Sequence, residues 1–129
     1  MLKRLMIAAA SLAAAGAAPA QELVTAYVVA QVPEGTGTVY ITGNSPVLGP
    51  WRPAGAAMYQ DGSRRIYALQ AREGFVFEYK FTLGSWETES LGQNGRSPTE
   101  NYRLVVGDQA VVQHVITGFR GAPSPAPGS

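Results

Sequence analysis

The amino-acid sequence predicts an all-β protein, an antiparallel β-sandwich of about seven to eight short strands. Runs rich in Val, Ile, Tyr and Phe alternate with Gly-, Pro- and Asn-containing turns about every 8 to 12 residues, and no helical period follows residue 20. The clearest run is 75–83, where every second residue is aromatic or Leu. Successive side chains of a strand point to opposite faces, so we expect the aromatic face in the core and the face with Lys80 toward water.

The first 20 residues have the pattern of an export signal. Lys3 and Arg4 precede an apolar run of about eleven residues, and Ala18-Pro19-Ala20 fits the small-x-small cleavage rule. The run is shorter than the roughly 20 residues of an ordinary membrane-spanning helix. We therefore expect residues 1–20 to be a signal peptide, and the mature protein to be secreted or periplasmic and not attached to a membrane.

Composition restricts the partners of the remaining chain. The whole sequence has ten Lys and Arg against nine Asp and Glu, and without Lys3 and Arg4 the balance becomes eight against nine. Such a chain has no basic field for a nucleic acid. It also has no cysteine, which excludes disulfides and thiolate sites. By size, 21–119 predicts one domain, and 120–129 is a Pro/Ser-rich tail expected to be flexible.

Turn residues divide the expected domain into strands. Asp61-Gly62-Ser63 separates two of them and is a hairpin signal, because Asp-Gly tolerates positive φ. Gly107-Asp108 is interpreted in the same way, as the turn of a last hairpin. The stretch 45–57 is rich in Pro and Gly and predicts a structured loop. The expected strands are 23–32, 38–42, 58–60, 65–69, 75–83, 102–106 and 110–117.

Residues for catalysis are scarce. His114 is the one histidine, and it shares strand parity with Val112 and Ile116, which favours a structural role in or near the core. There is no Gly-x-Ser-x-Gly nucleophile motif, and the acids Glu87, Glu89 and Glu100 lie in or beside an expected loop without a sign of a raised pKa. Metal-ligand spacing is also lacking. We expect no enzymatic activity, no catalytic residue, no metal and no cofactor.

Two tryptophans lie in loops instead. Trp51 follows Leu48-Gly49-Pro50, and Trp86 follows Gly84-Ser85. Sugars offer apolar C–H faces to an aromatic ring and hydroxyl groups to fixed polar side chains. The tryptophans would be the stacking plates of a carbohydrate site, and Lys80, Glu87 and Asn101 would supply donors and acceptors.

The sequence as a whole resembles the starch-binding domains of carbohydrate-binding module family 20 and their glycogen-binding relatives. The resemblance rests on Val39–Asn44, Leu48–Trp51, Phe77–Phe81, Trp86-Glu87 and Asn101–Leu104, in that order and at similar spacing. It implies an immunoglobulin-like sandwich and an α-1,4-glucan ligand, such as starch, glycogen or a malto-oligosaccharide. It also implies a site in which Trp51 and Trp86 stack on sugar rings, Lys80 and Asn101 bind hydroxyls, and Glu87 assists.

The chain departs from the family pattern at two places. Thirteen residues, 88–100, separate Trp86-Glu87 from Asn101, where such modules have only a few. A second site built on two tyrosines would have Tyr59 as one of them, but 33–37 offers no tyrosine for the other.

The alternative function is an exported β-sandwich interaction module that docks a separate hydrolase or another protein partner.

Overall fold

The computed structural model describes residues 22–121, so the expected signal peptide and residues 122–129 of the expected tail lie outside the described residues. Within 22–121 the chain forms ten strands and two short 3₁₀ helices, and none of these helices is long and apolar enough to cross a membrane. The prediction of an all-β sandwich is confirmed. In chain order the elements are β2 (Leu23–Gln31), β3 (Tyr40–Gly43), η2 (Pro46–Leu48), β4 (Ala56–Ala57), β5 (Tyr59–Asp61), β6 (Arg64–Arg72), β7 (Val76–Thr82), η3 (Trp86–Thr88), β8 (Ser90–Leu91), β9 (Tyr102–Val105), β10 (Val111–Val115) and β11 (Gly118–Phe119).

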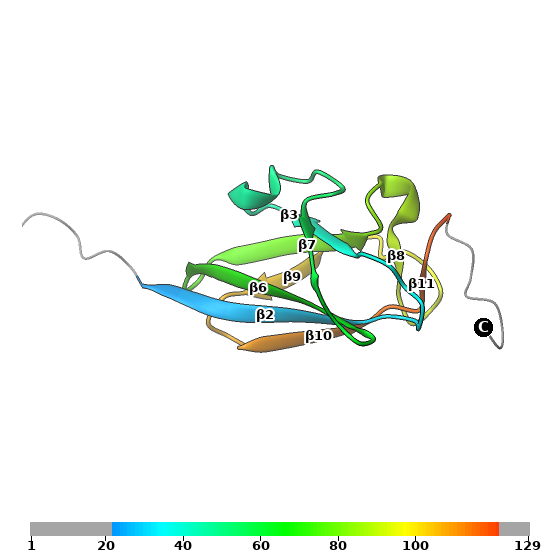
Figure 1. Ribbon diagram of the computed structural model, residues 1–129. Coiled ribbons are helices and arrows are strands. Elements are labelled where there is room, and N and C mark those ends of the chain that lie inside the picture. Colours follow the sequence, from blue (N-terminus) through cyan, green and yellow to red (C-terminus); the bar gives the residue numbers. More distant parts are fainter. Residues whose placement is uncertain (1–21, 122–129) are drawn as a thin grey trace, which may run out of the picture.

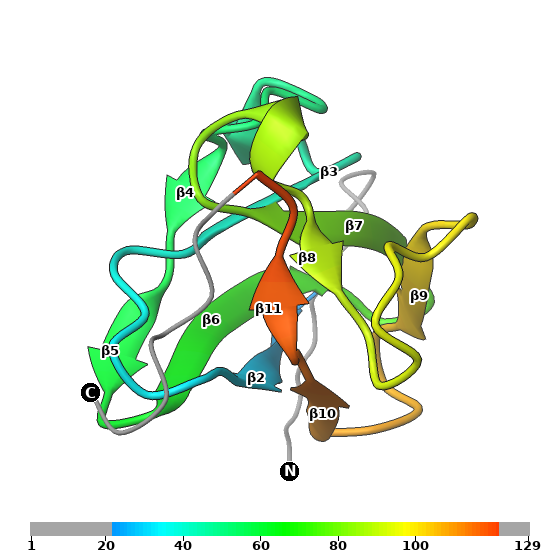
Figure 2. The same cartoon turned by 90° about the vertical axis from the view of Figure 1, so that its right-hand side faces the viewer.

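Two four-stranded sheets stack on one another (Figure 1). The β2 sheet has the strand order β10-β2-β6-β5, and the β7 sheet has the order β4-β3-β7-β9. The two-residue strands β8 and β11 pair at one end of the sandwich, which faces the viewer in Figure 2. Both large sheets place apolar side chains between them, and the buried core residues are Ala26, Val28, Ala30, Val32, Val39, Ile41, Leu48, Met58, Leu69, Phe77, Tyr79, Phe81, Leu104, Val106, Ile116 and Phe119.

The two faces of β7 differ as its alternation predicts, with one correction. Phe77, Tyr79 and Phe81 are fully buried in the core, as expected. The opposite face is not open to water, because Thr82 is also fully buried and Lys80 is half-buried. The Thr82 hydroxyl donates a hydrogen bond of 2.6 Å to the Pro53 carbonyl. The loop after β3 therefore covers part of the outer face of the β7 sheet.

The predicted last hairpin is wrong. β9 pairs with β7, whereas β10 crosses to the other sheet and pairs with β2, and that pairing is parallel. The two segments meet across the core instead, where the rings of Tyr102 and His114 have centroids 4.3 Å apart. In this arrangement β9 and β10 each turn their alternating apolar side chains toward the core, one from each sheet. If both strands were neighbours in one sheet, the other sheet would lack a strand at this edge and the core would be exposed there.

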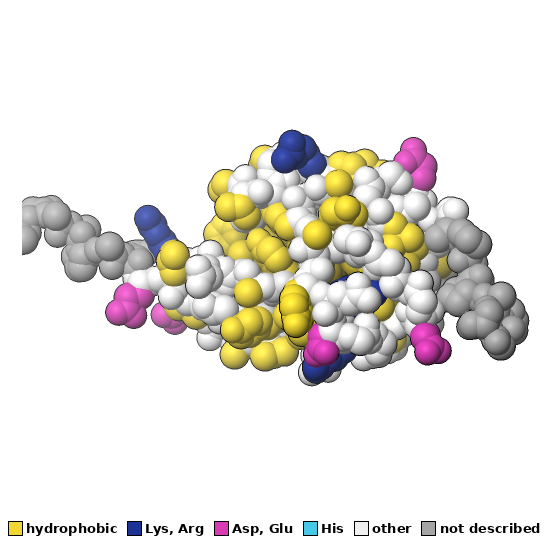
Figure 3. All heavy atoms as spheres, viewed as in Figure 1, with side chains coloured by type: hydrophobic (Ala, Val, Ile, Leu, Met, Phe, Trp, Pro, Cys, Tyr) yellow, Lys and Arg dark blue, Asp and Glu magenta, His cyan; other side chains and the backbone are white. Residues whose placement is uncertain are grey.

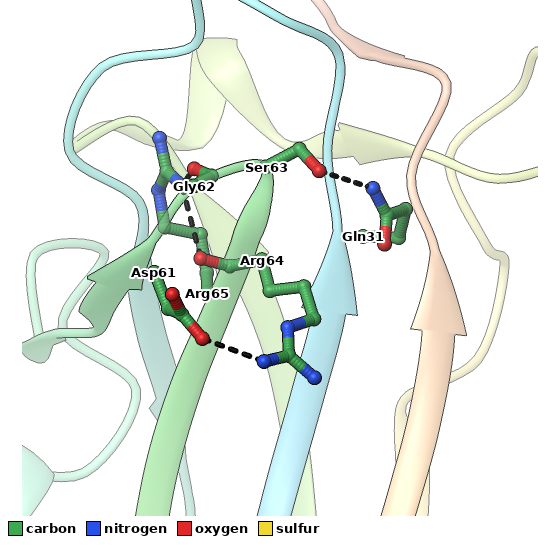
Figure 4. Close-up of polar contacts among 6 residues, drawn as sticks. All are labelled: Gln31, Asp61, Gly62, Ser63, Arg64 and Arg65. Atoms are coloured by element: carbon green, nitrogen blue, oxygen red, sulfur yellow. Dashed lines mark hydrogen bonds and ion pairs between the residues drawn. The ribbon is translucent and has the colours of Figure 1, made fainter.

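The predicted hairpin at Asp61-Gly62-Ser63 is confirmed, with β5 antiparallel to β6 and Gly62 at φ +60°. At its base Arg65 is only 2% exposed, and it forms no ion pair with a carboxylate of residues 22–121. Its guanidinium donates to the Gly62 carbonyl at 2.8 Å and the Arg64 carbonyl at 3.0 Å (Figure 4). It also donates to the carbonyls of Thr36 and Gly37, at 2.6 and 3.2 Å. Arg65 therefore ties the hairpin to the loop that follows β2.

Candidate functional site

Two loops rise from the outer face of the β7 sheet, and each contains one tryptophan. The first loop, residues 44–57, includes η2 and β4, and the second loop, residues 83–89, includes η3. Both lie on the same side of the molecule, above β3 and β7, in Figures 1 and 2. The two predicted stacking residues are therefore carried to one face of the sandwich.

Asn44 anchors the start of the first loop to β7. Its side-chain amide donates to the Val76 carbonyl at 2.9 Å, and its side-chain oxygen accepts from the Glu78 backbone N–H at 2.9 Å. Its own N–H donates to the Glu78 carbonyl at 3.0 Å. These bonds extend the β3–β7 pairing beyond Gly43 and fix where the loop leaves the sheet.

Trp51 has an unusual backbone within this loop. It is the one non-glycine residue at positive φ among residues 22–121, with φ +63°, and its N–H donates to the Gly43 carbonyl at 3.0 Å. A bulky side chain in the left-handed region costs about 1–3 kcal/mol, and such strain concentrates at binding sites. Trp51 is half-buried, so part of the residue stays accessible to solvent.

The second loop presents Trp86 at the start of η3. Ser85 and Thr88 form a capping box around this short turn, and the Thr88 hydroxyl donates to the Ser85 carbonyl at 2.8 Å. The Arg120 guanidinium donates to the Trp86 carbonyl at 3.0 Å. The backbone is thus held from both sides, while the Trp86 side chain is 37% exposed and the Glu87 side chain is exposed.

Lys80 projects from β7 toward this loop, but it is not free. Its Nζ lies 3.0 Å from Oε2 of Glu89, and the two side chains are only 18% and 10% exposed. Glu89 reaches this position because it forms a β-bridge with Thr82, the last residue of β7. The strand alternation located Lys80 on the outer face but gave no sign of this partner, because Glu89 lies in a stretch expected to be an irregular loop.

Asn101 returns to the same face despite the thirteen residues before it. Its Nδ2 donates to Oε1 of Glu78 at 3.1 Å, and Glu78 alternates with Lys80 on the outer face of β7. Asn101 directly precedes β9, whose pairing with β7 fixes it beside this strand. Sequence reasoning missed Glu78 and Glu89 as the acceptors of this site, although the parity of β7 places Glu78 beside Lys80.

Tyr59 lies apart from the other predicted residues. It is 70% exposed on β5, opposite Ile66 of β6, and so belongs to the outer face of the β2 sheet. The sandwich core separates it from the two tryptophan loops (Figure 1).

His114 lies at the core, as its parity predicts. Its Nε2 and the Tyr79 hydroxyl are 2.6 Å apart, and its ring also contacts Phe81 and Tyr102. Burial lowers the pKa of His114 to about 4 and raises the pKa of Tyr79, so both groups are neutral at pH 7. This aromatic cluster lies between the sheets and is part of the core.

Two hollows of the described surface lie away from the tryptophan loops. One of about 580 Å³ lies between 33–36 and the β5–β6 hairpin, and one of about 450 Å³ lies on the outer face of the β2 sheet. Residues 22–121 contain no group of three His, Cys, Asp or Glu that could hold a metal ion. Neither of the two hollows is lined by Trp51 or Trp86.

Neither a scan against protein-family models nor a search of curated proteins finds a match for this chain. Among solved structures, it is similar to a glycoside hydrolase family 15 glucoamylase from Hypocrea jecorina, with 20% identity and a TM-score of 0.47 over 85% of this chain. The chain spans 20% of the length of that glucoamylase chain.

Proposed function

We propose that this chain is an exported, non-catalytic module that binds α-1,4-glucans, such as starch, glycogen and malto-oligosaccharides, on the outer face of the β7 sheet. The observation that carries the proposal is the placement of both tryptophan loops on this one face, beside the Lys80–Glu89 pair. The resemblance of Leu48–Trp51, Phe77–Phe81 and Trp86-Glu87 to starch-binding domains supports the choice of glucan.

The chemistry of the face suits a sugar. The exposed indole of Trp86 offers an apolar plate for the C–H face of a glucose ring, and the partly accessible Trp51 offers another. Lys80 has three N–H donors, of which the contact with Glu89 uses one. Glu87 and Asn101 are exposed and can exchange hydrogen bonds with hydroxyl groups. Donors and acceptors at fixed positions beside a rigid plate are what an uncharged polyhydroxyl ligand needs.

The expected affinity for one short oligosaccharide is modest. A surface site leaves much of the sugar hydrated, which places the Kd on the order of micromolar to millimolar. A glucan polymer engages several modules at once and raises the apparent affinity.

The test is retention on insoluble starch together with titration by maltoheptaose. Trp86→Ala should weaken binding by about 5- to 30-fold, since loss of one stacking plate is worth about 1–2 kcal/mol. Trp51→Ala should act in the same direction. The matched control is Tyr27→Ala, which removes an aromatic residue of similar exposure, 43%, from the outer face of the other sheet. Thermal melts confirm that each variant is folded.

The result separates the proposed function from its alternative. Loss of retention in both tryptophan variants, with the control unchanged, supports the glucan site. Unchanged retention in both variants contradicts it, as does a wild-type protein that ignores starch and maltoheptaose. Binding to a separately expressed hydrolase in that last case would favour the docking module.

A further inference from the structure

The strand β10 has one unpaired edge. It pairs with β2 on one side, and no other described strand pairs with its far side. The Tyr27 N–H donates to the Ala110 carbonyl and the Ile116 N–H donates to the Gln31 carbonyl, both at 2.8 Å. In a parallel ladder every second residue of a strand bonds to its neighbour. The backbone groups of Val111, Gln113 and Val115 therefore face outward, available to a further strand.

This edge lacks the usual protection against pairing. Natural edge strands are short or carry charges, because an open edge attracts other strands. The opposite edge strand, β5, is three residues long and carries Asp61, and the β9 edge of the other sheet carries Arg103. In contrast, β10 reads Val-Val-Gln-His-Val and carries no carboxylate, Lys or Arg. Burial lowers the pKa of His114 to about 4, so that histidine adds no charge at neutral pH.

The face beside this edge is apolar and accessible. Val111 and Val115 are 47% and 46% exposed, and they adjoin Tyr27 and Gln31 in the ladder with β2. A shallow hollow of about 450 Å³ continues from β10 across β2 to Ile66 and Arg64 of β6. Figure 3 shows hydrophobic side chains on the lower part of the molecule, where β2 and β10 lie in Figure 1. The edge and the face are thus continuous.

The side chains along the edge are self-complementary. A two-fold axis perpendicular to the sheet at Gln113 would set a second β10 antiparallel to the first, with Gln113 opposite Gln113 and Val111 opposite Val115. Residues whose backbone groups face outward would form the hydrogen-bonded pairs of this ladder. The axis also keeps both apolar faces on the same side, so valine meets valine and no like charges meet.

We propose that the partner of this edge is a second copy of the chain, paired through β10 to give one sheet continuous across a two-fold dimer. The contact between two five-residue strands is small, so the dimer is weak and reversible, with a Kd on the order of micromolar or above. The tryptophan loops lie on the outer face of the other sheet and stay free. The proposal is therefore independent of the glucan site.

The experiment measures mass by sedimentation equilibrium over about 10 µM to 1 mM, the range that such a weak contact needs. Wild-type protein should shift from one chain mass toward two. Gln113→Lys and Gln113→Glu each place like charges opposite one another across the axis, so each alone should remain a monomer. An equimolar mixture of the two should recover the dimer, because opposite charges then face each other. Gln70→Lys adds a charge to β6, two strands away from this edge, and should dimerise like the wild type.

Thermal melts establish that all variants are folded. A wild-type protein that stays monomeric throughout the range overturns the proposal. Dimerisation of Gln113→Lys alone overturns it as well, and so does a mixture that fails to recover the dimer. Titration with maltoheptaose separates this proposal from the glucan site, because the monomeric variants should bind it with unchanged affinity per chain.

Discussion

Replacing Arg65 by Met should destabilise the fold far more than the same change at the neighbouring Arg64. Arg65 is 2% exposed and donates to four backbone carbonyls, those of Thr36, Gly37, Gly62 and Arg64. Arg64 is on the surface, where its contact with Asp61 joins side chains that are 54% and 50% exposed (Figure 4). The two substitutions are chemically identical, so the difference between them reports the burial of Arg65 together with its hydrogen bonds.

The magnitude follows from the carbonyls left without a donor. A buried acceptor that loses its partner costs about 1–3 kcal/mol, but Gly37 and Gly62 lie at the surface and can turn to water. Release of a desolvated cation offsets part of the loss. We therefore expect Arg65→Met to lower the free energy of unfolding by about 2–4 kcal/mol. Arg65→Lys should lower it by slightly less, and it should not restore full stability, because one ammonium cannot span the fork of the guanidinium. Exposed pairs such as Arg64–Asp61 contribute about 0–1 kcal/mol.

Urea denaturation followed by tryptophan fluorescence provides the measurement. The midpoint should shift for Arg65→Met and hardly move for Arg64→Met, with similar slopes for both. Equal losses at the two positions, or a loss below about 1 kcal/mol at Arg65, would refute the view that this guanidinium holds the hairpin against the loop after β2.

Three further changes test the packing around β3, β7 and β10. Between pH 7 and 4.5 the free energy of unfolding should fall by about 2–3 kcal/mol through His114. Its pKa is about 4 in the folded chain and about 6.5 in the unfolded chain, so the unfolded chain binds the proton first as the pH falls. His114→Gln should flatten this part of the pH dependence in denaturant titrations. Gly43→Ala should lower stability by about 2–3 kcal/mol, since a Cβ there would lie 2.2 Å from the Glu78 carbonyl oxygen, and an unchanged melting temperature would contradict this. Thr42→Val should leave stability equal or raise it by up to about 1 kcal/mol, because the buried Thr42 hydroxyl has no hydrogen-bond partner within the described part of the chain. A clear loss of stability on thermal melting would contradict this.

Local patterns predicted the parts of the fold that local physics decides. The alternation of Phe77, Tyr79 and Phe81 identified the buried face of β7, and Asp61-Gly62 identified the β5–β6 turn. The same alternation held a signal that was missed. In the expected strand 65–69, Arg65 shares parity with Leu69, and this places an arginine on the core face. An arginine at an apolar position of a strand indicates a buried guanidinium that needs backbone acceptors.

Contacts between segments far apart in the sequence could not be predicted in this way. The Gly107-Asp108 turn is equally compatible with a hairpin and with a crossing to the other sheet, and only the pairing of β10 with β2 decides between them. The partial burial of Lys80 also results from contacts between segments far apart in the sequence. It depends on where Glu89 and the first loop come to lie, which strand parity does not encode.

The two faces of β7 have separate roles, one in the core and one in the proposed site, so the site can be tested without unfolding the protein. Phe77, Tyr79 and Phe81 fix the strand from the core side, and pairing with β3 and β9 fixes its register. Glu78 and Lys80 therefore point to the outer face for reasons independent of any ligand. The indole of Trp86 extends from a turn held by Ser85, Thr88 and backbone bonds, so its removal leaves the capping box and the Arg120 contact intact. A loss of glucan binding in folded Trp86→Ala would then be a property of the surface itself, because the framework beneath it does not depend on that side chain.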